Sequence, residues 1–253
     1  MVSASSEHAV AEISSADFER SGGVDLLTCV ASRLALVVRQ FVPAPECEAH
    51  VRGVYAGRER WTADFDAVQH SLGRAWYTHL EQDRTNDYFE GAGASDALVE
   101  ELLPGLQRRM IDAVGRLAGG EARRRRGWCG PGVHIFPAGE WLAQNGGDIH
   151  YDTEGLPRHH TARRAPALTL VLMLQPPIVG GELRVWATRY HDTDEVSPDD
   201  LAAPSALVHY GVGDLLVVDS YRLHQIQPFA GARDRVSTTA HELRAGPRWD
   251  VWF

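Results

Sequence analysis

Three residues of this sequence have the types and the order of a metal site. His150 and Asp152 stand one residue apart in GGDIHYDTEG (146–155), and His224 follows far downstream. Two neutral imidazoles and one carboxylate leave coordination positions open, as non-haem Fe(II) oxygenases require. Taken singly, His150 also fits a loop histidine, Asp152 a turn cap and His224 a core histidine. The pattern predicts an Fe(II) site if the fold brings the three side chains together.

A second candidate site follows His224. In RVSTTAHEL (235–243), a period of two places Arg235, Ser237 and Thr239 on one face of a strand. An arginine buried on that face needs an anionic partner, and a carboxylate fits its fork of donors. The predicted strands offer no obvious acidic partner, so a dicarboxylate co-substrate is expected there. The alternative is a surface ion pair with Asp219 or Asp234.

The elements that must position these residues begin after Trp128. Eight short β-branched or alternating segments are separated by turn residues; they are 132–137, 148–152, 166–175, 181–187, 205–211, 214–219, 223–229 and 235–243. Eight antiparallel strands in two Greek keys form a double-stranded β-helix, the jelly roll of cupin-like proteins. In that arrangement the end of the second strand and the start of the seventh meet at one mouth. His150, Asp152 and His224 would meet there.

The N-terminal half has the periodicity of helices. Helices are predicted over 24–41, 45–57 and 95–120, with Ser95 as N-cap and a kink at Pro104, while 58–94 reads as irregular and rich in aromatics. Helices followed by strands is the α+β order, with the helices packed on one sheet. We expect a single domain over 1–253. Its mostly helical N-terminal part is 1–127, and its jelly-roll catalytic core is 128–245.

Composition excludes several classes of function. A net charge of -9 argues against a nucleic-acid partner, and RRRR (123–126) reads as a solvated loop rather than an anion contact. No apolar segment is long enough to cross a membrane, and the first 20 residues lack the apolar region of a secretory signal. Three cysteines, odd in number and far apart, indicate a cytoplasmic location.

Three longer segments resemble a known family, the Fe(II)/2-oxoglutarate-dependent oxygenases, and in particular its prolyl-4-hydroxylase-like branch. The segments are IFPAGEWLAQNGGDIHYD, ALTLVLMLQPPIVGGELRVW and GDLLVVDSYRLHQIQPFAGARDRVSTTAHEL, within roughly residues 128 to 245. They resemble the strand leading to H-x-D, the hairpin ending in GGEL, with Gly180 and Gly181 in its turn, and the closing segment with its histidine and arginine.

The resemblance implies a set of cofactors and residue roles. His150, Asp152 and His224 would bind Fe(II), and Arg235, assisted by Ser237, would hold the distal carboxylate of 2-oxoglutarate. With O2, such enzymes couple decarboxylation of 2-oxoglutarate to oxidation of a substrate, releasing succinate and CO2. The branch often has a tyrosine on the third strand beside that carboxylate. Met173 stands there in this sequence, so Thr169, Ser237 or Thr239 is expected to replace it.

A small-molecule substrate is expected, a free amino acid or an intermediate of secondary metabolism, because the chain carries no added recognition domain. The segment 58–94 and the loop 153–165 should line the pocket mouth. Arg163 would grip an anionic substrate, and Trp76 and His134 would face the pocket. A solvated loop, a core tryptophan and a core or edge histidine are the structural alternatives for these three residues.

Three other functions stay open at this point. A peptidyl or protein prolyl hydroxylase would have an open groove. A non-catalytic cupin-like protein would keep the metal but not bind 2-oxoglutarate. A zinc hydrolase or isomerase would act without O2. A homodimer also stays open as the alternative to a monomer.

Overall fold

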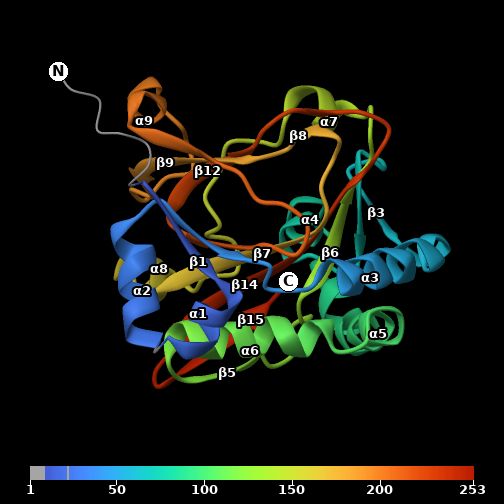
Figure 1. The fold of residues 1–253 in the computed structure, drawn as a ribbon, viewed down its shortest axis with the longest axis horizontal. Helices are drawn as coiled ribbons and strands as arrows, with labels where there is room; N and C mark the ends of the chain where they lie inside the picture. Colours follow the sequence, from blue (N-terminus) through green and yellow to red (C-terminus); the bar gives the residue numbers. More distant parts are fainter. Residues whose placement is uncertain (1–8, 22) are drawn as a thin grey trace.

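Two sheets face each other, and helices cover the outer face of the larger sheet (Figure 1). This computed structural model describes residues 9–21 and 23–253. The first eight residues, to which part of the expectation about a secretory signal refers, lie outside the described residues. Among the residues that the structure describes, no helix is long and apolar enough to span a bilayer.

The larger sheet runs in the order β1-β2-β11-β7-β14-β6-β4-β3. Its strands are β1 (Val10–Ser14), β2 (Ala35–Arg39), β3 (Thr62–Asp64), β4 (Gln69–Leu72), β6 (Gly132–Phe136), β7 (Ala167–Gln175), β11 (Leu215–Asp219) and β14 (Arg235–Ala245). The last strand, β15 (Arg248–Trp252), pairs with β14 and with β5 (Glu121–Arg124). The long strands β7 and β14 pair with each other at the centre of this sheet.

The smaller sheet consists of β10 (Ser205–Val208), β9 (Leu183–Arg189) and β12 (Arg222–Ile226), in that order. The strands β8 (Val179–Gly180) and β13 (Phe229–Ala230) form a separate short, two-stranded sheet. Gly180 and Gly181 have positive φ angles of 77° and 80° and make the turn before β9, as expected. A Cβ at Gly180 would stand 2.3 Å from the carbonyl oxygen of Pro228, so only glycine fits this turn.

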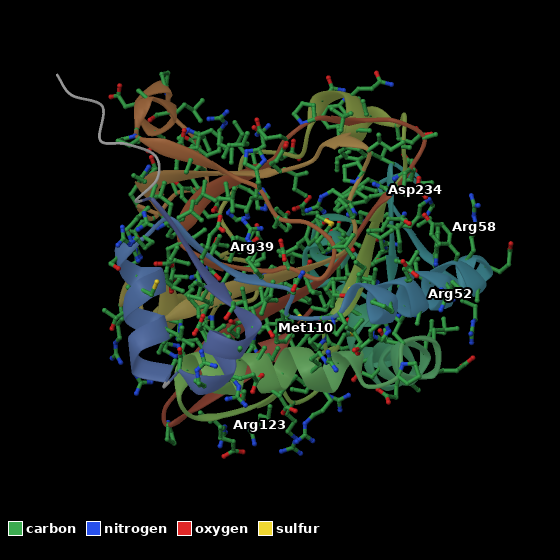
Figure 2. The ribbon with its side chains drawn as sticks, in the orientation of Figure 1. Arg39, Arg52, Arg58, Met110, Arg123 and Asp234 are labelled. Atoms are coloured by element: carbon green, nitrogen blue, oxygen red, sulfur yellow. The ribbon has the colours of Figure 1, made fainter. Side chains whose placement is uncertain are left out.

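The helices are α1 (Ser15–Arg20), α2 (Gly23–Ser32), α3 (Ala44–Ala56), α4 (Trp76–Glu81), α5 (Thr85–Leu102), α6 (Leu106–Ala118), α7 (Trp141–Asn145), α8 (Arg158–Ala162) and α9 (Pro198–Ala202), with a 3-10 turn at Arg58–Arg60. α2, α3 and α6 contact the larger sheet. Met110 of α6 is fully buried between the helix and the sheet, whereas Arg123 points away from it (Figure 2). The main hydrophobic core therefore lies between the helices and one sheet face.

Alternation along β14 divides its side chains between two environments. Val236 and Ala240 are buried in the core beneath the helices. Arg235, Ser237 and Thr239 point to the other face, toward the smaller sheet, where they line a cavity. The period of two predicted from the sequence is confirmed, and it determines which side chains can meet the metal site.

The predicted class, an α+β jelly roll with N-terminal helices packed on one sheet, is confirmed. Seven of the eight predicted strands are present, but 148–152 is no strand and forms only a single bridge from His150 to His224.

Several predictions for the N-terminal half were wrong. The helix expected over 24–41 ends at Ser32, and Ala35–Arg39 forms a buried strand, because ALVVR pairs with β1 and β11. The segment 58–94 is not irregular but holds β3, β4, α4 and the start of α5. Ser95 lies inside α5 rather than at a cap, although the break near Pro104 is present. In RRRR, the first two arginines belong to β5 rather than to a loop.

Candidate metal centre

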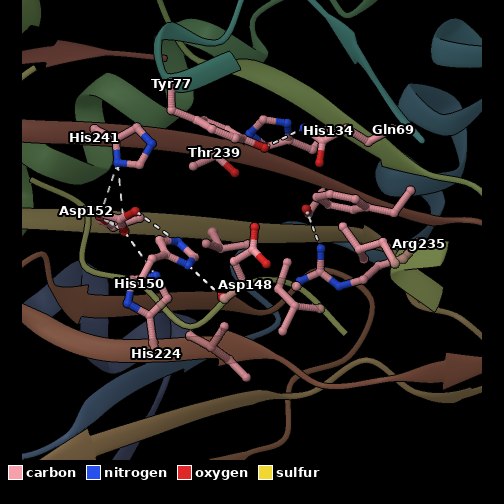
Figure 3. A pocket seen from close by; sticks show the side chains of 18 of the residues that line it. Gln69, Tyr77, His134, Asp148, His150, Asp152, His224, Arg235, Thr239 and His241 are labelled. Atoms are coloured by element: carbon pink, nitrogen blue, oxygen red, sulfur yellow. Dashed lines mark hydrogen bonds and ion pairs between the residues drawn. The ribbon is translucent and has the colours of Figure 1, made fainter. Parts of the chain in front are cut away.

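His150, Asp152 and His224 meet at the mouth between the two sheets. One ligand atom from each lies within 4.8 Å of the others. The Asp152 carboxylate is 3.5 Å from Nε2 of His150 and 3.3 Å from Nε2 of His224 (Figure 3). Paired backbone hydrogen bonds between His150 and His224, 3.1 and 3.0 Å long, fix the two segments side by side. The fold thus brings together the three ligands predicted from the sequence.

Backbone carbonyls orient both imidazoles. Nδ1 of His150 lies 2.8 Å from the carbonyl oxygen of Asp148, and Nδ1 of His224 lies 2.9 Å from that of Arg222. With a proton on each Nδ1, and with the Nε2 proton of His150 displaced by the metal, both Nε2 atoms would offer a lone pair to a shared metal. Two such nitrogens and one carboxylate oxygen suit Fe(II) and leave coordination positions open.

Asp152 is held by a hydroxyl and surrounded by histidines. The Thr169 hydroxyl donates to Oδ2 of Asp152 over 2.6 Å, and Nδ1 of His241 lies 4.0 Å from the same oxygen. Burial opposes the ionised carboxyl, but His224, His241 and His150 outweigh it and hold the pKa of Asp152 well below its usual range. Burial likewise opposes a charge on His150, but the hydrogen bond and charge of Asp152 raise its pKa to about 9. This carboxylate is therefore ionised and ready to bind a cation.

Arg235 lies across the cavity from the triad (Figure 3) and is only 1% exposed. It donates to the carbonyl oxygen of Gly181 over 3.3 Å, to the Ser237 hydroxyl over 2.9 Å and to the Tyr210 hydroxyl. All three acceptors are neutral. Among residues 9–21 and 23–253 it has no carboxylate partner, so the alternative ion pairs with Asp219 and Asp234 do not form. A buried guanidinium with neutral partners favours an anionic ligand.

Tyr210 is a site residue that the sequence reasoning missed. It lies between β10 and β11, and its hydroxyl bonds to Arg235. Met173, at the place where a tyrosine was sought, is buried between the sheets and does not line the cavity. The signal in the sequence was a tyrosine next to a strand end, but only the fold shows which one reaches Arg235.

Thr169 lies too far from Arg235 to replace this tyrosine. It pairs in register with His241, six residues along β14 from Arg235, which is roughly 20 Å of strand. Its hydroxyl serves Asp152 instead. Of the three proposed replacements, only Ser237 contacts Arg235 directly.

The triad and Arg235 line one cavity of about 480 Å³ between the sheets. Aromatic side chains cover much of its wall, among them Phe65, Trp76, Tyr77, Trp141 and Trp252. A cavity of this size and lining is typical of sites for small molecules.

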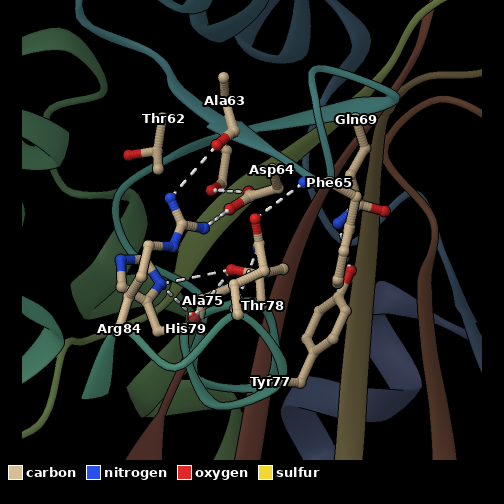
Figure 4. Close-up of polar contacts among 12 residues, drawn as sticks. Thr62, Ala63, Asp64, Phe65, Gln69, Ala75, Tyr77, Thr78, His79 and Arg84 are labelled. Atoms are coloured by element: carbon tan, nitrogen blue, oxygen red, sulfur yellow. Dashed lines mark hydrogen bonds and ion pairs between the residues drawn. The ribbon is translucent and has the colours of Figure 1, made fainter.

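A buried ion pair holds α4 at this cavity. Arg84, just after α4, donates to Oδ1 of Asp64 over 2.7 Å, and the Ser71 hydroxyl donates to Oδ2 over 2.7 Å (Figure 4). Asp64 is completely buried. Gln82 accepts from the amide of Phe65 over 3.0 Å. These bonds tie α4 to the hairpin of β3 and β4 and thereby place Trp76 and Tyr77 in the cavity wall.

The three predicted substrate residues are placed differently from one another. His134 and Trp76 line the cavity, and Trp76 also packs against Tyr88 and Trp128. Burial lowers the pKa of His134 to about 3, so its ring is neutral. Arg163 is exposed at the end of α8 and does not line the cavity, so the expected grip on an anionic substrate finds no support there.

Solved structures with the same arrangement of elements exist. Two structures of the epimerase SnoN match, one described as a complex with Fe3+, α-ketoglutarate and nogalamycin RO, the other as a non-heme α-ketoglutarate-dependent epimerase from nogalamycin biosynthesis. Each is 16% identical over 91% of this chain and 84% of its own, with TM-scores of 0.58 and 0.61. The chain has the SnoN fold. No protein-family model and no curated protein matches it.

Proposed function

We propose that this protein is an Fe(II)- and 2-oxoglutarate-dependent oxygenase that hydroxylates an unactivated C–H bond of a small molecule, with release of succinate and CO2. One observation carries the proposal: a His-Asp-His triad lines the same cavity as a buried arginine that has no anionic partner among the described residues. The likeness to SnoN supports the general class, since those structures are described as α-ketoglutarate-dependent.

The residues that line the cavity fit both Fe(II) and 2-oxoglutarate. Nε2 of His150, Nε2 of His224 and the Asp152 carboxylate would hold Fe(II), and Arg235 with Ser237 and Tyr210 would hold the distal carboxylate of 2-oxoglutarate. When bound, the metal and 2-oxoglutarate would supply the activation of O2.

The chain's own part is positioning and the exclusion of water. Thr169 and the carbonyls of Asp148 and Arg222 hold the three ligands in one orientation. The aromatic wall would limit the access of water to the reacting centre. A cavity of about 480 Å³ favours a small-molecule substrate, such as an intermediate of secondary metabolism, over the peptide that a prolyl hydroxylase would take in an open groove.

Epimerisation is a second candidate outcome, because the structures of similar fold are described as epimerases. The two outcomes differ in the fate of oxygen. With labelled O2 and a substrate in hand, hydroxylation places one labelled atom in the product, whereas epimerisation places none.

The first test needs no substrate. Fe(II) is added without oxygen to the full chain, and 2-oxoglutarate is titrated while the visible charge-transfer band of the chelate is recorded. We expect a saturable band that Asp152→Ala and Arg235→Met weaken strongly. The matched control Arg163→Met removes an exposed arginine outside the cavity and should leave the band unchanged.

Other results would favour the remaining alternatives. Folded, iron-loaded protein without a band would favour a non-catalytic metal-binding protein, and activity with Zn2+ in the absence of O2 would favour a hydrolase or isomerase. A cytoplasmic location stays a prediction from the cysteines, and the choice between monomer and homodimer stays open.

A further inference from the structure

The rim of the cavity is acidic, whereas the sequence had suggested cations there. Glu81, at the end of α4, and Asp148 and Glu154, on either side of the H-x-D segment, all line the cavity. In the part of the chain that the structure describes, none of the three forms an ion pair with an arginine. The arginines of the 153–165 loop lie elsewhere: Arg163 is exposed, and Arg164 binds Asp192.

Glu81 and Asp148 are close enough for the charge of one carboxylate to affect the other. Burial, together with the charge of Asp148, raises the pKa of Glu81. A cation bound beside Glu81 and Asp148 would relieve this repulsion.

The proposed cofactors would not neutralise this rim. The charges of Fe(II) and Arg235 balance those of Asp152 and the two carboxylates of 2-oxoglutarate. Among the residues that the structure describes, Glu81, Asp148 and Glu154 are then the acidic cavity groups without a counter-charge. A positively charged group of the substrate is the partner that this arrangement favours.

A second, independent feature points to a ligand in the same cavity. His134 is 5% exposed, and its Nδ1 has no hydrogen-bond partner among the described residues. It lies beside Tyr77, 5.6 Å between ring centroids, and both face the cavity (Figure 3). A buried ring nitrogen without a partner needs a polar group of a ligand to satisfy it. Trp76 and Trp252 supply aromatic faces for a flat molecule.

We propose that the cavity selects a flat, apolar substrate that carries a protonated amine, with the amine held at the rim by Glu81, Asp148 and Glu154. This inference rests on the proposed function, whose substrate class it names. It replaces the anionic substrate that the loop sequence had suggested.

Three probes of similar size and different charge test the proposal: tryptamine, the neutral tryptophol and the anionic indole-3-propionate. Their binding to the full chain, loaded with Fe(II) and 2-oxoglutarate without oxygen, is measured by calorimetry. Tryptamine should bind roughly tenfold more tightly than tryptophol, since three partly exposed ion pairs each contribute modestly. Indole-3-propionate should bind most weakly, and the preference for tryptamine should shrink at high ionic strength.

The variant Glu81→Gln/Asp148→Asn/Glu154→Gln should lose the preference for tryptamine. A control that neutralises three exposed carboxylates outside the cavity, Glu48→Gln/Glu59→Gln/Glu121→Gln, should keep it. Absence of tryptamine binding, equal binding of tryptamine and tryptophol, or a preference that survives in the rim variant would overturn the proposal. The salt dependence of the parent protein tests it even if the rim variant does not fold.

The charge-transfer titration of 2-oxoglutarate and the amine titrations, both on Fe(II)-loaded protein, separate this proposal from the proposed function. A tryptamine preference without a 2-oxoglutarate band would refute the oxygenase and retain the amine site. A 2-oxoglutarate band without a preference for tryptamine would refute the amine site and retain the oxygenase.

Discussion

Tyr210 illustrates how one side chain can complete a site from outside the expected strand. Its hydroxyl and that of Ser237 bond to the Arg235 guanidinium and hold it in place. Tyr210→Phe should therefore weaken 2-oxoglutarate binding by roughly tenfold, the loss expected for one hydrogen bond to a charged group. The control Met173→Leu changes the residue at the usual tyrosine position and should leave the dissociation constant unchanged. Titration of the charge-transfer band measures both, and an effect of Met173→Leu alone would contradict this assignment.

Glu242, unlike Tyr210, is a buried polar residue whose side chain makes no hydrogen bond to the part of the chain that the structure describes. It is completely buried on β14, and neither carboxyl oxygen has a hydrogen-bond partner among the described residues. Burial raises its pKa well above the ordinary value of 4.5. The folded protein therefore keeps a proton here that the unfolded chain releases.

This proton makes the free energy of unfolding depend on pH. Above pH 4.5 the unfolded state binds fewer protons at this residue, so stability should fall as pH rises, by up to about 1.4 kcal/mol per pH unit. The decline should stop once pH passes the raised pKa. Glu242→Gln removes the ionisable group and should flatten this slope and stabilise the protein at neutral pH. Urea unfolding across pH tests this, and parallel slopes for parent and variant would refute it.

At the scale of elements, α4 depends on one buried ion pair. Arg84→Met leaves the buried Asp64 with only the Ser71 hydroxyl and should cost about 3 kcal/mol of stability. Asp64→Asn/Arg84→Met removes both charges and should recover part of that loss. Because α4 forms the aromatic wall and not the triad or Arg235, 2-oxoglutarate binding should stay unchanged. Denaturant unfolding of the two single variants, Asp64→Asn and Arg84→Met, and of the double variant measures the coupling, and purely additive losses would argue against it.

At the scale of the whole molecule, the N-terminal half is part of the sheet as well as its cover. β2 pairs with β11, and β3 and β4 extend the sheet beyond β6. The helices bury the other face of β7 and β14. We therefore predict that residues 1–253 form a single domain and that the fragment 128–253 does not fold by itself, because it would expose two sheet edges and a hydrophobic face. Circular dichroism and denaturant unfolding test this, and a cooperative transition of the fragment would show two separable units.

Local signals in the sequence predicted the jelly roll, and together with the resemblance to a known family they named the triad and Arg235 as candidate site residues. Alternation along β14 and the H-x-D segment depend on spacing within a strand or turn, which is a local property. The same local signals failed at ALVVR (35–39), whose apolar run fits a helix or a buried strand equally well until its neighbours are known.

Only the tertiary structure decided which distant residues meet. Tyr210, Glu81 and Thr169 reach the cavity through strand pairing and loop paths that no short motif encodes. The charge of the rim was likewise undetermined by the sequence, since the arginines of 153–165 and the acids beside them are equally near in the chain. Their orientation depends on packing: Arg164 turns to Tyr190 and Asp192, and Glu154 turns to the cavity.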